Sequence, residues 1–116
     1  MTDFSKANFT PEEIVSYLKQ TAQLRDVYEK LLSQHVVQNG AHERNLTVSP
    51  SELQAEAERL RREHRLEKAA DTFAWLAEHL MDADDWEAGI YATLLAQKLA
   101  DALFMGVNRL EMKVVE

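Results

Sequence analysis

The sequence predicts an all-α, single-domain protein: a bundle of about five helices around one long C-terminal helix, followed by a short C-terminal strand. Three observations support this class. Helix-start patterns recur along the chain, apolar residues repeat at three- and four-residue steps, and the 116 residues include only three Gly and two Pro. So few turn-forming residues suit helices joined by short loops. A chain of this length can bury a core as one domain.

The long helix is expected over residues 83–105. Asp82 can cap its N-terminus, and Asp85 can reach back towards Asp82 in a variant of the capping box. Gly106 is expected to end the helix. The apolar stripe consists of Trp86, Ile90, Leu94, Leu95, Leu99, Ala102 and Leu103. At 1.5 Å per residue the helix is roughly 33 Å long, so the other elements are expected to pack along it.

The chain opens with a polar stretch, residues 1–8, which we expect to be flexible. The first helix then begins with a strong local pattern. Thr10 is the N-cap, Pro11 takes the first helical position and Glu13 completes a capping box. The helical domain is therefore expected to occupy residues 9–106.

The second helix is expected from about Val27, and its end has two interpretations. Asn39 and Gly40 can form a turn that ends it. Alternatively it continues to about Arg44, and Gly40 costs roughly 1 kcal/mol relative to Ala. We prefer the second interpretation, because a loop of about ten residues would be long for so compact a chain and Asn45 offers a better stop.

The third helix repeats the start pattern of the first. Ser49 is the cap, Pro50 follows, and Glu52 completes the box, so the helix is expected to run to about His64. Its outer face carries charges of both signs, which favours a solvated face over an anion site. The candidates for a charged rim on this face are Arg61, Arg62 and Arg65.

A fourth helix is expected over residues 69–79, with one face turned inward and an aromatic residue left on the other. The inward face is Phe73, Leu76, Ala77 and Leu80, and the other carries Trp75 and His79. After the long helix, residues 109–114 alternate strictly between polar and apolar, which predicts a short strand within a tail over 107–116. A lone strand needs a partner, such as a second copy of the chain.

Composition excludes several classes of protein. The absence of Cys excludes disulfides and thiolate sites, and the net charge of −7 argues against a general nucleic-acid binder. No apolar run is long enough to span a membrane, and the first residues lack the pattern of a signal peptide. We therefore expect a cytoplasmic protein without a nucleic-acid or membrane partner.

Candidate metal ligands have simpler interpretations. His35 and His42 are seven residues apart, but no third ligand is spaced to join them. His64 and His79 each lie near a helix end, where capping explains them better. The acids Asp82, Asp84, Asp85 and Glu87 lie where a helix N-terminus attracts carboxylates, and they lack the calcium-loop pattern. No metal, cofactor or catalytic residue is therefore predicted.

The apolar side chains of the last two helices are numerous for a bundle of this size. Exposed aromatic and Met side chains suit a surface for varied apolar peptides, and the alternative is that the bundle buries all of them. The candidate peptide-binding residues are Trp75, Trp86, Tyr91, Phe104 and Met105.

Residues 45–104 resemble the helical N-terminal domain of SurA-type and PrsA-type chaperones, which belong to the parvulin family of peptidyl-prolyl isomerases. The resemblance is carried by the segments 46–53, 71–76, 84–87 and 98–100. The opening pattern of the first helix is similar to small parvulin-like proteins encoded beside ribosomally made, enzymatically modified peptides. Only residues 107–116 follow the helical part, so we expect no isomerase activity.

The resemblance implies a non-catalytic, chaperone-like accessory protein that binds a precursor peptide or its modifying enzyme during the maturation of ribosomal peptide natural products. One alternative is a structural or regulatory module that self-associates, for example as a homodimer through the C-terminal strand or through exchanged helices. A second alternative is a small enzyme that uses the acidic residues or the histidines.

Overall fold

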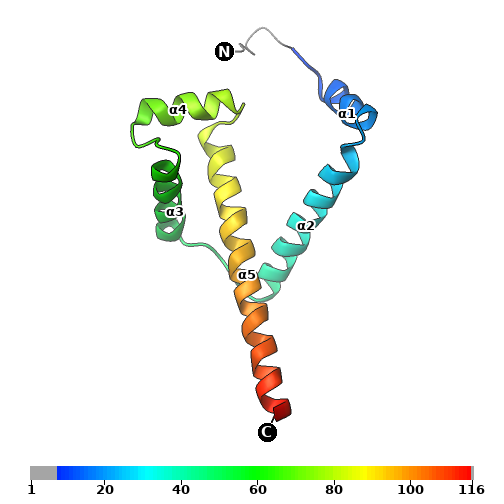
Figure 1. Cartoon of the computed structure of the whole chain (residues 1–116), viewed down its shortest axis with the longest axis vertical. Coiled ribbons are helices and arrows are strands. Elements are labelled where there is room, and N and C mark those ends of the chain that lie inside the picture. Colours follow the sequence, from blue (N-terminus) through cyan, green and yellow to red (C-terminus); the bar gives the residue numbers. More distant parts are fainter. Residues whose placement is uncertain (1–7, 116) are drawn as a thin grey trace. The chain divides into compact units, whose positions relative to one another are not determined.

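The computed structural model describes residues 8–115, and for residues 106–115 it describes only the backbone (Figure 1). Within this range the chain forms five helices and no strand, which confirms the all-α class. The flexible stretch expected at residues 1–8 lies outside the described residues except for its last position. The helices are α1 (Pro11–Gln20), α2 (Leu24–Glu43), α3 (Pro50–Glu63), α4 (Ala69–Glu78) and α5 (Ala83–Val115).

The chain divides into two compact units, Met1–His35 and Val36–Glu116. In the first unit, α1 starts as predicted: the Thr10 hydroxyl accepts a hydrogen bond from the Glu13 backbone N–H at 3.1 Å, and Pro11 takes the first helical position. None of the residues of α1 is buried. The helix is therefore defined by its local sequence rather than by a core.

The helix α2 continues through Asn39 and Gly40 and ends at Glu43, so the preferred interpretation is confirmed. Packing explains the glycine. A Cβ atom at position 40 would lie 3.0 Å from Cδ2 of Leu99 on α5. Gly40 therefore allows the end of α2 to approach α5 closely, and this contact offsets its low helix propensity.

The core of the second unit lies where the end of α2, the loop before α3 and the middle of α5 meet. Ala41, Val48 and Leu95 form a buried cluster, and Leu53 of α3 and Tyr91 of α5 pack against it. The helix α3 runs beside α5 (Figure 1). Among the described residues only seven apolar side chains are buried, so this core is small.

Four helix ends close without glycine. Ala22, Asn45, Arg65 and Leu80 each adopt the left-handed conformation, with φ between 56° and 58°. Each belongs to a Schellman motif, in which the next residue donates back into the last helical turn. For example, the Leu66 N–H donates to Arg61 O at 2.6 Å and the Met81 N–H to Leu76 O at 2.9 Å. These motifs explain how short connections form in a glycine-poor chain.

The predicted end of the long helix is wrong. The helix α5 passes through Gly106 and continues to Val115, so the residues expected to form a C-terminal strand are helical. A single glycine costs only about 1 kcal/mol in a helix. A lone strand would leave its backbone groups unpaired, whereas a helix satisfies them within the segment.

None of the helices in the described part of the chain combines the length and apolar character needed to cross a bilayer.

The predicted facing of α4 is also wrong. Leu76 is buried, as expected, but Phe73 and Leu80 are 65% and 69% exposed. Trp75, expected on the outer side, is half-buried. The inner face also holds Thr72, whose hydroxyl donates to Leu66 O at 2.7 Å. This polar contact and the buried Leu76 set the rotation of α4, and they leave apolar side chains on its outer face.

Candidate functional site

The five candidate peptide-binding residues differ in exposure. Trp75 on α4 is half-buried, as are Trp86 and Tyr91 on α5. Phe104 and Met105 on α5 are 65% and 54% exposed. Tyr91 packs against the core cluster, so part of its surface is already committed to the fold.

These residues do not gather in one groove. Trp86 and Phe104 lie on the same helix, 18 residues apart, which corresponds to about 27 Å along the axis. Trp75 and Trp86 flank the connection between α4 and α5, whereas Phe104 and Met105 lie well beyond the core. The chain therefore offers two separate apolar regions on α4 and α5.

Two imidazole rings partly cover the Trp75 side chain. The ring centroids of His64 and His79 lie 5.5 Å and 4.1 Å from that of Trp75. His79 Nδ1 lies 2.8 Å from Trp75 O, to which it can donate a hydrogen bond. Both histidines are C-cap residues, of α3 and α4, which confirms their predicted capping role.

The arginines proposed as a charged rim have different environments. Arg61 is half-buried and holds the α3–α4 connection: it donates to Leu66 O at 3.0 Å, to Glu67 O at 2.8 Å and to the Thr72 hydroxyl at 3.1 Å. Arg62 and Arg65 are exposed. The Arg61 side chain is therefore committed to the fold, whereas the side chains of Arg62 and Arg65 are exposed to solvent.

Further exposed apolar side chains lie on α1 and α2, at the three- and four-residue spacing typical of a core-facing stripe. Spacing alone does not reveal whether the covering surface belongs to the same chain. The sequence signal that could have identified these exposed residues is a number of apolar helix stripes larger than the core of one small domain can cover. The exposed residues are Ile14, Val15, Tyr17, Tyr28, Leu31, Leu32 and Val36.

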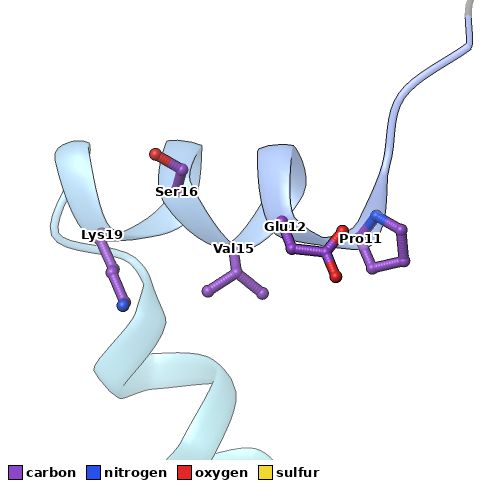
Figure 2. Close-up of a pocket in the computed structure, with 5 residues that line it drawn as sticks. All are labelled: Pro11, Glu12, Val15, Ser16 and Lys19. Carbon is purple, nitrogen blue, oxygen red and sulfur yellow. The ribbon is translucent and has the colours of Figure 1, made fainter.

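A shallow hollow of about 340 Å³ lies along one side of α1 (Figure 2). It is lined by Pro11, Glu12, Val15, Ser16 and Lys19, all from α1 itself. Because one helix supplies the whole lining, the hollow is an open surface feature rather than an enclosed ligand cavity. It places one apolar side chain between a carboxylate and an ammonium group.

One polar contact links α3 to α5. Lys98 Nζ lies 2.8 Å from Glu52 Oε1, and the Glu52 carboxylate also accepts the Ser49 backbone N–H at 3.0 Å. The Lys98 hydrogen bond, followed by those at Ser49, lowers the pKa of Glu52 from 4.5 to about 2. Hydrogen bonding to Glu56, more than the charge of Glu63, raises the pKa of Arg59. Both effects have a structural explanation and do not indicate catalysis.

The acidic cluster at the start of α5 serves as a cap. The Asp85 N–H donates to Asp82 Oδ1 at 2.8 Å, and the Asp82 N–H donates to Asp85 Oδ2 at 3.1 Å. This reciprocal pair confirms the predicted capping box. Within the described residues no group of three or more His, Cys, Asp or Glu side chains is arranged to hold a metal ion.

Comparison with known proteins adds no relative. No protein-family model matches the sequence, and neither a curated protein nor a solved structure matches it.

Proposed function

We propose that this chain is a non-catalytic, chaperone-like accessory protein that holds a segment of another polypeptide against uncovered apolar helix faces. The supporting observation is the number of large apolar side chains that the described helices leave exposed. Single exposed apolar residues are normal on a monomer, whereas contiguous groups mark interaction surfaces. On α5 the group Leu103, Phe104 and Met105 is 46%, 65% and 54% exposed.

The geometry of a helix makes this group informative. Consecutive residues lie about 100° apart around the axis, so three consecutive exposed side chains leave most of the circumference open. A soluble helix normally covers one apolar stripe with its own core. This segment of α5 has apolar side chains in several directions, which suits contact with a second polypeptide.

The partner that fits best is a precursor peptide or the enzyme that modifies it, in the cytoplasm. This choice is supported by the resemblance to the helical part of SurA-type and PrsA-type chaperones and to small proteins associated with ribosomal peptide maturation. The helical domain holds its partner without chemical change.

Calorimetric titration with a candidate precursor peptide and with its modifying enzyme tests the proposal. Replacing Phe104 and Met105 together by Ser should weaken binding roughly tenfold or more, because apolar contact is lost. Gln97→Ser, an exposed polar change on the same helix, is the matched control and should leave affinity unchanged. Absence of binding to both partners would refute the proposal.

A second candidate function is self-association through exchanged helices. It is favoured by α1, which has no buried residue although Ile14 and Tyr17 are large and apolar. A partner copy could supply the missing cover. Sedimentation equilibrium should then show a concentration-dependent dimer, and a strictly monomeric chain at high concentration would exclude this candidate.

A further inference from the structure

The connection between α4 and α5 has an apolar surface that the fold does not use. Phe73 on α4 and Leu80 after it are 65% and 69% exposed. Ala70, which precedes them, and Ala77, which lies between them, are exposed as well. The buried Leu76 lies beside this surface, because it is three residues from Phe73 and four from Leu80. The apolar stripe of α4 is therefore wider than the part that packs within the described chain.

The backbone at Leu80 adds an independent observation. Its φ is 58°, and its N–H donates to Ala77 O at 3.1 Å in the Schellman motif that ends α4. Glycine suits this position, because a side chain there costs free energy in the left-handed conformation. Of the four described residues with positive φ, Leu80 alone is a large apolar residue. Neither backbone geometry nor burial explains this leucine.

The segment that carries this surface is acidic along the sequence, although the exposed Lys68 directly precedes it. Residues 69–97 contain six carboxylates and neither Lys nor Arg. All six are exposed, and the ion pairs found among the described residues involve other carboxylates. A surface of this kind concentrates cations and repels anions. The six carboxylates are Asp71, Glu78, Asp82, Asp84, Asp85 and Glu87.

We propose that the outer face of α4, together with the acidic start of α5, docks a basic peptide segment in which Lys or Arg residues accompany large apolar side chains. The apolar side chains would contact Phe73 and Leu80, and the cations would lie near the surrounding carboxylates. This inference rests on the proposed function and adds to it a second contact region, apart from Leu103, Phe104 and Met105, with a class of ligand.

Charge complementarity selects this occupant over others. A second copy of the chain carries a net charge of −7, so it would be repelled here on average. The arginines of α3 in such a copy would not supply a purely basic surface, because they alternate with carboxylates and Arg59 is already paired with Glu56 and Glu63. A nucleic acid would be repelled by the six carboxylates of residues 69–97.

Three synthetic peptides test the inference on the full chain. The first has Leu and Phe at fixed positions and Lys between them, the second has Glu in place of Lys, and the third keeps Lys but has Ser in place of Leu and Phe. Tryptophan emission reports binding, because Trp75 and Trp86 flank the site. At about 50 mM salt the first peptide should bind at least tenfold more tightly than either other peptide. The preference over the Glu peptide should shrink as salt is raised.

The variant Leu80→Gly separates binding from folding. It should raise the melting temperature, because glycine relieves the left-handed backbone, and it should weaken binding of the first peptide roughly fivefold or more. Gln97→Ser, an exposed polar change farther along α5, is the control and should leave this affinity unchanged.

Equal binding of the Lys and Glu peptides would overturn the inference and leave the proposed function standing. Equal binding of the two Lys peptides would also overturn it, because attraction would then require no apolar contact. If none of the three binds, the inference fails. The proposed function fails only if the titrations with a precursor peptide and its enzyme are also negative.

Discussion

Lys98 on α5 and Glu52 on α3, 46 residues apart in the sequence, are joined by a 2.8 Å contact between Nζ and Oε1. The same ammonium group donates to Thr47 O at 2.7 Å, so it also fixes the loop before α3. Glu52 meanwhile caps α3 by accepting the Ser49 N–H. One lysine therefore connects the middle of the long helix to the start of the helix beside it.

This contact predicts acid sensitivity. The folded state lowers the pKa of Glu52 from 4.5 to about 2, so the stability that its ionised form contributes is present above pH 4.5 and is lost as the pH falls towards 2. Glu52→Gln should therefore destabilise the protein at pH 7, and its difference from the parent should shrink between these two values. Urea unfolding followed by circular dichroism measures the stability of the parent and of the variant at each pH.

Glu29→Gln provides the control for that experiment. Glu29 forms an exposed i,i+4 pair with Arg25, and such pairs contribute little to stability. A Glu52→Gln variant that matches Glu29→Gln at pH 7 would contradict the structural role of the Lys98 contact.

Two of the three glycines inside helices, Gly40 and Gly89, should respond differently to alanine. A Cβ at Gly89 meets nothing within 4 Å, so Gly89→Ala should stabilise the protein by about 0.5–1 kcal/mol through helix propensity. A Cβ at Gly40 would approach Leu99 to 3.0 Å, so Gly40→Ala should gain less or destabilise. Thermal unfolding of both variants compares them. An equal gain at the two sites would show that α2 and α5 are not in close contact at Gly40.

Arg61 should contribute more to the stability of the fold than its neighbour Arg62. Arg61→Met removes the donor shared by Leu66 O, Glu67 O and the Thr72 hydroxyl, and it should cost about 1–3 kcal/mol of stability. Arg62→Met, at an exposed position, should change stability by less than about 0.5 kcal/mol. Chemical denaturation separates the two variants, and similar values would refute the assigned role of Arg61.

The end of α3 should accept glycine. Arg65 has a φ of 57°, so Arg65→Gly should stabilise the protein by about 0.5–1 kcal/mol. Arg62→Gly, inside the same helix, should destabilise it by about 1 kcal/mol. The melting temperature should therefore rise for Arg65→Gly and fall for Arg62→Gly, although the two positions are only three residues apart. A loss of stability in both variants would contradict the left-handed assignment.

The helix starts could be predicted because their causes are local. The Ser49 capping box needs only Glu52, three residues away, and the Asp82 cap needs only Asp85, so the pattern in the sequence already contains the contact. The helix ends were harder to predict. Leu80 adopts a conformation usually associated with glycine, and Gly106 does not end α5.

The candidate site depended on information absent from the sequence pattern. The spacing of Phe73 and Leu76 is compatible with one inward face, and the structure turns only Leu76 inward. The rotation of α4 depends on the contact between Thr72 and Leu66 O, which spacing does not predict. The prediction that the last two helices carry surplus apolar side chains agrees with the exposure of Phe104 and Met105. Which polypeptide covers them stays a prediction.

The most direct test of the central claim is the heat-capacity change on binding, measured by calorimetry at several temperatures with the Lys-containing amphipathic peptide. If apolar helix faces receive the partner, their burial should make this change negative, and Phe73→Ser should reduce its magnitude. A heat-capacity change of zero, or no binding heat at any temperature, would contradict the claim that the exposed side chains of α4 and α5 form a binding surface.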